Sequence, residues 1–328
     1  MRAFRGRFTL AVVTAGLLCC ALLGGAASGA ERKPIFVLAD PSGDDHGDGT
    51  LQYPMRTDLQ PGDLDLVSFA AYAEKGGTLF EATFARRIRP PERRTIDQVG
   101  TTLDRVARLG FYALNIDVYV DTDRIPYSGS TQMLPGRRAT IAPANAWEKA
   151  ICLTPRPYDA HDLLQAIAVR GSKAELKRKQ GSVTSDDLEK INAGVSRDIA
   201  SSVYFPTMIT VSGRSIRFFV PDSFLGGPAK DTWSYVVAVT GADWELKVDL
   251  SALVGSEGPV PSLMIIPILP GRGENNFGTN REGDNLQPDL IDIIVPPGTT
   301  QEAVLKDYDL LGGRAVALPG VVPADLKK

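Results

Sequence analysis

The sequence predicts an all-β protein, mainly antiparallel, that is interrupted by one helical insertion. Glycine and proline are frequent, with 32 and 23 of 328 residues, and such a turn-rich composition favours strands and turns over a helical bundle. Segments in which polar and apolar residues alternate recur along the chain, which is typical of strands. Helical periodicity is concentrated in one later segment, which predicts an insertion into the β-domain.

The first strands are expected near the beginning of the chain. Residues 35–38 form a short apolar run. Residues 63–72 and 78–84 alternate between polar and apolar side chains, and a turn with two adjacent glycines separates them. Two such segments around a glycine turn predict a β-hairpin. Residues 113–121 alternate in the same way, with the polar side chains on one face of the strand.

Two segments have helical periodicity. Apolar residues recur every three or four positions in residues 96–109, which predicts a helix. From about 157 to 201 the chain carries two more apolar stripes with helical spacing. Thr184, followed three residues later by Asp187, has the pattern of a capping box with Asp in place of the usual Glu. We therefore expect residues 157–201 to form the helical insertion.

Strand character returns after the insertion. Residues 207–211 and 215–221 flank a Ser-Gly-Arg turn, which predicts a second hairpin. The β-branched and aromatic residues at 232–240 form the strongest β segment of the chain. The remaining predicted elements are strands at 263–269 and 290–295 and a short helix at 300–308.

The N-terminus has the three parts of a secretory signal peptide. Three arginines precede the apolar stretch of residues 8–23, and small residues precede a cleavage site near Ala30. The sequence therefore predicts that residues 1–30 are a signal peptide and that residues 31–328 are a single mature module, secreted or periplasmic. The alternative of an uncleaved membrane anchor is disfavoured because the apolar run is short and small residues follow it.

Charge and motif content exclude several classes of function. The net charge is −3 and the sequence has no basic stripe, so nucleic acid is not an expected partner. The mature chain keeps only Cys152, so stability must come from packing and not from a disulfide. The chain has no G-x-S-x-G motif, and His46 and His161 do not have metal-ligand spacing. We therefore do not expect an enzyme.

The loop at residues 40–50 is the strongest candidate for a site. Its glycines can adopt positive φ and turn carboxylates inward, and crowded carboxylates need a positive charge to offset their repulsion. Oxygen ligands in a flexible loop suit Ca²⁺, so a structural Ca²⁺ ion is expected here. Asp121, at the end of a strand, is expected to reach the same ion across the sheet. The alternative is a solvated acidic turn without an ion. The carboxylates of the loop are Asp40, Asp44, Asp45 and Asp48.

Aromatic side chains are the candidates for a carbohydrate site. Sugar binding needs exposed aromatic faces, and the candidates by residue type are Trp147, Trp244 and Tyr119. For each tryptophan the alternative is packing in the core. A rival function is haem binding, which needs Met or His as an axial ligand. The residues available for it are Met208, Met264 and His161. A third alternative is a structural envelope protein that contacts a protein partner through the helical insertion.

Several motifs agree in order along the mature chain. They are D-P-x-G-D-D-x-G-x-G-T at 40–50 with Tyr53-Pro54, D-V-Y-V-D at 117–121, I-x-F-x-V-P at 216–221, W-x-Y-x-V-x-V at 233–239, and D-L-I-D at 289–292 with Gln301 and Leu305. Together these motifs resemble the C-terminal module of glucodextranase, a module also appended to amylopullulanase-type enzymes. The resemblance spans residues 33–318. It implies an antiparallel β-sandwich of the same broad type as sugar- and haem-binding DOMON-like domains, and a non-catalytic module that binds carbohydrate or a cell-envelope component.

Overall fold

The computed structural model describes residues 32–243, 262–280 and 286–327. The chain divides into two units, Met1–Arg32 and Lys33–Lys328, and the second unit carries the fold. The predicted signal peptide at residues 1–30 and the candidate Trp244 lie outside the described residues. Within the described part, every helix is too short or too polar to cross a lipid bilayer.

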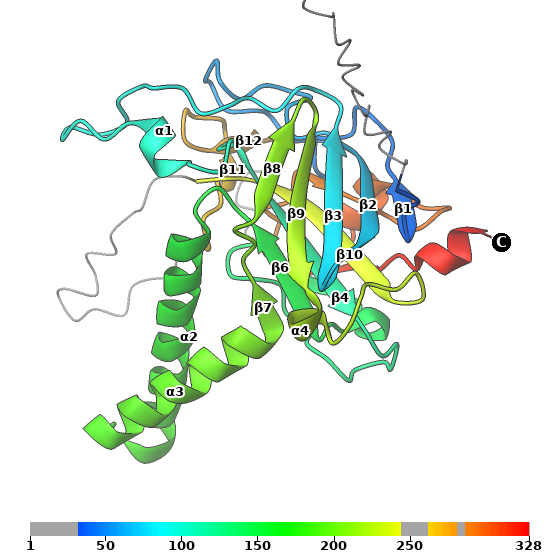
Figure 1. The fold of residues 1–328 in the computed structure, drawn as a ribbon. Helices are drawn as coiled ribbons and strands as arrows, with labels where there is room; N and C mark the ends of the chain where they lie inside the picture. The colour runs from blue at the N-terminus through cyan, green and yellow to red at the C-terminus, as the bar shows by residue number, and fades with distance from the viewer. Residues whose placement is uncertain (1–31, 244–261, 281–285, 328) are drawn as a thin grey trace, which may run out of the picture. The chain divides into compact units, whose positions relative to one another are not determined.

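Two five-stranded sheets form the framework of the second unit (Figure 1). Within these sheets the neighbouring strands are antiparallel except β6 and β7, so the prediction of a mainly antiparallel β protein is confirmed. The first sheet contains, in order, β1 (Phe36–Ala39), β2 (Leu66–Glu74), β3 (Gly77–Phe84), β9 (Ser215–Pro221) and β8 (Ile209–Ser212). The second sheet contains β13 (Asp292–Ile293), β10 (Ser234–Gly241), β4 (Leu114–Asp121), β6 (Lys149–Leu153) and β7 (Val203–Tyr204).

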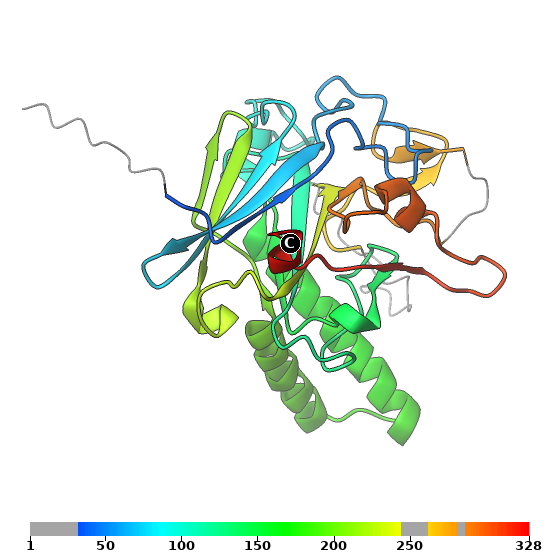
Figure 2. The same cartoon turned by 90° about the vertical axis from the view of Figure 1, so that its right-hand side faces the viewer.

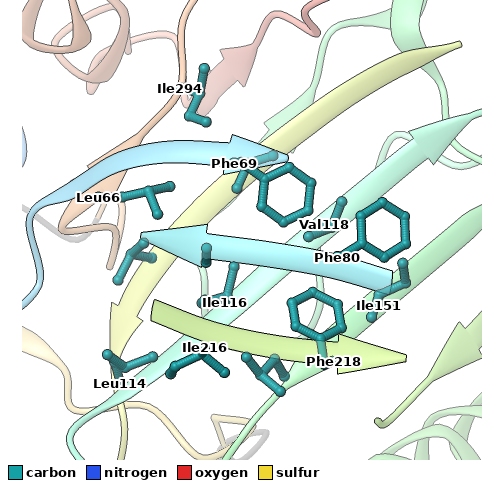
Figure 3. Packing of buried hydrophobic residues seen from close by; sticks show 14 of the residues in the cluster. Leu66, Phe69, Phe80, Leu114, Ile116, Val118, Ile151, Ile216, Phe218 and Ile294 are labelled. Carbon is teal, nitrogen blue, oxygen red and sulfur yellow. The ribbon is translucent and has the colours of Figure 1, made fainter. Parts of the chain in front are cut away.

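The main core lies between the two sheets, which makes the unit a β-sandwich. Because successive side chains of a strand point to opposite faces, alternate residues of each sheet meet in this layer. From the first sheet, Phe80 stacks between Phe69 and Phe218, with ring centroids 5.4 and 5.6 Å apart. Figure 3 shows these rings facing Ile116 and Val118 of the second sheet.

The second sheet is covered on its other face as well. The helices α2 (Pro157–Gln180) and α3 (Ser185–Ser202) occupy the segment predicted as an insertion and pack against β6 through a second core. Every residue of β4 is buried, including the polar side expected to alternate with the apolar one, and this second core also includes Leu134 and Leu263. Asp117 is satisfied there by Arg137, whose Nε and Nη2 donate to the carboxylate over 2.7 and 3.1 Å.

Two local predictions have different outcomes. The capping box at Thr184 is present, with reciprocal hydrogen bonds between Thr184 and Asp187. The helix predicted at 96–109 is wrong, because only α1 (Leu103–Val106) forms. The Asp97 carboxylate accepts the N–H groups of Val99 and Thr101, and this local bonding competes with helix formation.

The remaining elements are short. The strand predicted at 263–269 is largely wrong, since only β11 (Ile268–Pro270) forms, after Pro267. That strand pairs in parallel with β12 (Phe277–Thr279), and β5 (Ala139–Ile141) pairs in parallel with β14 (Val316–Leu318). The short helices are α4 (Asp222–Leu225), α6 (Gln301–Leu305) and the 3₁₀ turns η1 (Pro143–Asn145) and η2 (Pro323–Lys327).

Candidate functional sites

An acidic cluster lies where edge strands of the two sheets meet. Asp40 directly follows β1, Asp65 directly precedes β2, and Asp292 is the first residue of β13. β1 is the edge strand of the first sheet and β13 that of the second. In Figure 2 the blue segment after β1 lies beside the orange segment around α6. Three carboxylates from distant parts of the sequence thus converge at one edge of the sandwich.

The cluster contains buried carboxylate oxygens that accept no hydrogen bond. Asp40, Asp44 and Asp292 each place a carboxylate oxygen within 4.8 Å of the others. Asp292 is fully buried, and its Oδ2 accepts the N–H of Leu66 over 2.7 Å, which links the two sheets directly. The buried oxygens without a partner are Asp40 Oδ2, Asp44 Oδ1, Asp65 Oδ1 and Asp292 Oδ1.

Burial and mutual repulsion disfavour the charged form of these carboxyl groups. Burial, followed by the charge of Asp44, raises the pKa of Asp40 to about 8. Burial also raises the pKa of Asp44 to about 6. The pKa of Asp292 is raised well above its usual range by burial and then by Asp40 and Asp44. The cluster therefore favours a compensating positive charge, supplied either by bound protons or by a cation.

Asp45 and Asp48, also predicted as ligands of the ion, each accept hydrogen bonds within and beside the acidic loop. Asp45 Oδ2 accepts the hydroxyl of Tyr53 and the N–H of Gly62, the latter over 2.6 Å. Asp48 Oδ1 accepts the N–H and the hydroxyl of Thr50 over 3.0 and 2.6 Å. These two carboxylates lie outside the group formed by Asp40, Asp44 and Asp292 and hold the loop in shape.

The helix α6 fixes the loop from the other side. Gln301 Nε2 donates to the carbonyl of Gly47 over 3.1 Å, and Gln301 Oε1 accepts the N–H of Ile293 over 2.7 Å. His46 Nε2 lies 3.0 Å from Glu302 Oε1. Gly47 has a φ of +59°, and a Cβ at this position would lie 3.1 Å from the carbonyl oxygen of Leu290, so glycine suits the close approach.

Asp121 does not meet the loop, which corrects the expectation drawn from the sequence. It lies toward the opposite end of β10 from Asp292, because Asp121 pairs with Ser234 at the start of β10, whereas Asp292 pairs with Val239 near its end. Asp121 instead groups with Asp123 and Glu148. The N–H of Arg124 donates to Asp121 over 2.6 Å, and the guanidinium of Arg124 lies 3.7 Å away, so this second group already has a cation.

Two of the three predicted aromatic candidates, Tyr119 and Trp147, belong to the described residues, and both lie in the core. Tyr119 is 1% exposed, and its hydroxyl accepts the N–H of Leu134. Trp147 is 8% exposed, and its Nε1 donates to the carbonyl of Gln132 over 2.9 Å. Their ring centroids are 5.5 Å apart. Neither ring offers a free face for a sugar, and Trp244 stays a prediction.

The candidate haem ligands lie in different parts of the fold. Met208 is 58% exposed beside the first sheet, whereas Met264 is buried in the second core. His161 lies on α2 next to Asp162 and Phe205. An axial haem ligand needs a pocket that shields the ring from water, and the exposed Met208 does not provide one.

The outer face of the first sheet carries a row of apolar side chains that the sequence reading did not single out. Tyr72 pairs with Leu79 across β2 and β3, and Leu79 pairs with Phe219 across β3 and β9. Directly paired residues point to the same face, so the three side chains stand side by side. Met208 extends the row, since its carbonyl accepts the N–H of Phe219. We call these four residues the outer row.

Polar side chains accompany the outer row. On the same face, Arg217 Nε donates to Glu81 over 2.8 Å, and the hydroxyls of Thr83 and Ser215 lie 2.9 Å apart. A shallow groove of about 470 Å³ runs along this region. The groove is lined by Glu74, Lys75, Leu79, Met208, Ile209, Thr210, Arg217 and Phe219.

Comparison with known families gives one match. Residues 35–320 match a family described as the C-terminal binding module, SLH-like, of glucodextranase. The match includes both sheets, the two long helices and the acidic cluster, so it covers nearly all of the second unit and not one motif. It confirms the resemblance carried by the sequence motifs. No curated protein matches the chain.

Proposed function

The chain belongs to the family of SLH-like C-terminal binding modules of glucodextranase, and from this premise we propose that it is a non-catalytic module that binds carbohydrate. Its ligand is a glycan of the cell envelope or its surroundings. The predicted signal peptide supports this setting, because it would deliver the mature chain to the periplasm or the exterior. We assign the binding surface to the outer row and the groove beside it.

The single observation that carries this assignment is the cross-strand alignment of Tyr72, Leu79 and Phe219 on a sheet face. Sugar rings present C–H groups on their faces and hydroxyls at their edges. The two aromatic rings of the row, those of Tyr72 and Phe219, can pack against the ring faces. Nearby polar groups, such as the Arg217–Glu81 pair, can bond to the hydroxyls at the edges.

The charges around the outer row favour a neutral glycan. Lys75 and Arg217 supply two positive charges, and Glu74 and Glu81 supply two negative ones. Glu81 and Arg217 neutralise each other directly, over 2.8 Å. A polyanionic glycan would need an excess of positive charge, and a polycationic one an excess of negative charge. We therefore expect binding to be only weakly sensitive to salt.

A glycan array probed with the purified protein tests the proposal. We expect binding to neutral polysaccharides, followed by a loss of affinity of roughly tenfold in Tyr72→Ala and in Phe219→Ala, because each removes one aromatic contact. The matched control is Tyr158→Ala, since Tyr158 is 74% exposed but lies on α2. This control should bind as the unchanged protein does.

Two outcomes would contradict the assignment. If Trp244→Ala abolishes binding while Tyr72→Ala and Phe219→Ala do not, a glycan binds elsewhere on the module. If no glycan binds under any condition, the carbohydrate function itself is wrong and a protein partner becomes the better candidate. Melting curves of all variants separate a lost contact from a lost fold.

A further inference from the structure

We propose that Asp40, Asp44 and Asp292, with Asp65 beside them, bind one Ca²⁺ ion that joins the edges of the two sheets. This site differs from the one the sequence suggested, because it leaves out Asp45, Asp48 and Asp121. The inference is independent of the outer row and of any glycan.

The first observation is the convergence of three carboxylates from both sheets. Asp40, Asp44 and Asp292 each offer an oxygen within 4.8 Å of the others, which is the spacing that one bound ion would bridge. Asp40 and Asp44 come from the N-terminal loop, whereas Asp292 comes from a strand near the end of the chain. Local turn formation alone does not account for a contact between residues so far apart in sequence.

The second observation is independent of the grouping. Asp292 is fully buried, and its Oδ1 accepts no hydrogen bond. A carboxylate oxygen of Asp292 lies within 4.8 Å of oxygens of Asp40 and Asp44. A buried carboxylate oxygen without a partner is costly, and native proteins normally satisfy it. Asp40, Asp44 and Asp65 each contribute one more such oxygen. An ion coordinated by Asp40, Asp44 and Asp292 would offset the charge of these carboxylates together, and Asp65 lies near enough to act on them electrostatically.

The chemistry of the donor set favours Ca²⁺. The group that could hold an ion consists of carboxylates alone, which are hard oxygen donors. Zn²⁺ prefers nitrogen and sulfur ligands, and Mg²⁺ demands near-ideal octahedral geometry and keeps several waters. A buried site assembled from a glycine-bearing loop and a strand end better suits the flexible coordination of Ca²⁺.

The ion would act as a link between the sheets. Asp40 extends from β1 and Asp65 leads into β2, both in the first sheet, while Asp292 belongs to β13 in the second. The hydrogen bond from the Leu66 N–H to Asp292 already joins the sheets at this point. An ion beside that bond would offset the repulsion between the carboxylates and hold the edge closed.

The experiment uses the full mature protein and the metal alone. After treatment with EDTA and dialysis, calorimetric titration with CaCl₂ should give one tight site per chain. At an ion concentration about 100 times the dissociation constant, the melting temperature should rise by roughly 5 °C or more. MgCl₂ at the same concentration should raise the melting temperature much less.

The variant Asp292→Asn tests the carboxylate with the strongest structural support as a ligand of the ion. It makes residue 292 permanently neutral while keeping an oxygen that can accept the Leu66 N–H, so the melting temperature without metal should equal or exceed that of the unchanged protein. The rise on adding Ca²⁺ should disappear. The matched control is Asp123→Asn, which makes the same change in the second acidic group and should leave the Ca²⁺ response intact.

Three results would overturn the proposal. The first is a titration without heat or stoichiometry, together with a melting temperature that neither EDTA nor Ca²⁺ changes; the carboxyls would then be satisfied by protons. The second is an Asp292→Asn protein that responds to Ca²⁺ as the unchanged protein does. If Asp292→Asn fails to fold, Asp44→Asn takes its place, and an unaltered Ca²⁺ response in that variant is the third.

Discussion

Gln301 links three parts of the chain through one side chain. Its amide nitrogen donates to the carbonyl of Gly47 in the acidic loop and lies 3.2 Å from that of Ile291, and its oxygen accepts the N–H of Ile293. Gln301 is 3% exposed, so water cannot replace these bonds. The loop, β13 and α6 therefore depend on one buried amide.

We predict that Gln301→Leu destabilises the protein by about 2–4 kcal/mol, because it leaves several buried backbone groups without partners. Urea unfolding followed by tryptophan fluorescence measures the change. Gln60→Leu is the control, since Gln60 is exposed and its side-chain amide donates to the neighbouring carbonyl of Thr57. Equal unfolding midpoints for the two variants would show that the amide bonds contribute nothing.

At the same scale, the sequence predicts part of the acidic site and misses the rest. Asp40 and Asp44 stand out because the loop crowds carboxylates within a few positions. Asp292 lies about 250 positions later, and only strand pairing brings it to the loop. Its place in the D-L-I-D motif at 289–292 is a signal that could have led to it. Tyr119 is buried, against expectation, because Leu134 and Trp147 cover a face of β4 that alternation marks as polar.

At the scale of elements, α3 owes its beginning to a local feature. The Thr184 hydroxyl accepts the N–H of Asp187, and Asp187 accepts the N–H of Thr184. Only one stripe of α3, including Val195 and Ile199, packs against the second core. The first turn of the helix is exposed, so its cap supplies much of what holds it in place.

We predict that Thr184→Ala lowers stability by about 1 kcal/mol and loosens the first turn of α3 before the rest of the fold. Amide hydrogen exchange should show faster exchange at residues 186–188 and unchanged exchange in β4. Glycan affinity and the Ca²⁺ response should not change. Slower or unaltered exchange at these residues would mean that the capping box does not stabilise α3.

Strands and helices can be predicted from the sequence where neighbouring residues determine them. The two hairpins of the first sheet follow from alternation and glycine turns, and β2–β3 and β8–β9 pair as expected. The helix expected at 96–109 failed because apolar spacing says nothing about the Asp97 carboxylate, which captures nearby N–H groups. β13 is shorter than the apolar run that contains it, because only Asp292 and Ile293 pair with β10 and two prolines, Pro296 and Pro297, follow the run.

At the scale of the whole second unit, the outer row and the acidic cluster lie on different parts of the sandwich. The outer face of the first sheet is open and carries the outer row, whereas the second sheet is covered on both faces. The acidic cluster lies at the edge of the sandwich, between β1, the edge strand of the first sheet, and β13, the edge strand of the second. Binding at the open face can therefore be tested separately from the closure of the edge.

The charge balance of that edge gives a prediction about pH. In the ion-free protein the pKa of Asp40 is raised from 3.8 to about 8 and that of Asp44 from 3.8 to about 6, chiefly by burial. Between pH 3.8 and about pH 8, the folded state therefore binds more protons than the unfolded state. Its stability falls as the pH rises through this range. With EDTA present, we expect stability to be highest near pH 4, as far as these two groups decide it, and to fall through pH 6 to 8.

Saturating Ca²⁺ should remove this fall, because the ion stabilises the ionised carboxylates that protons otherwise neutralise. The difference between melting temperatures with Ca²⁺ and with EDTA should therefore widen as pH rises from 5 to 8. Asp40→Asn should flatten the EDTA curve, since it removes the group with the pKa of about 8. Parallel curves with and without Ca²⁺ would mean that the ion does not act on these carboxylates.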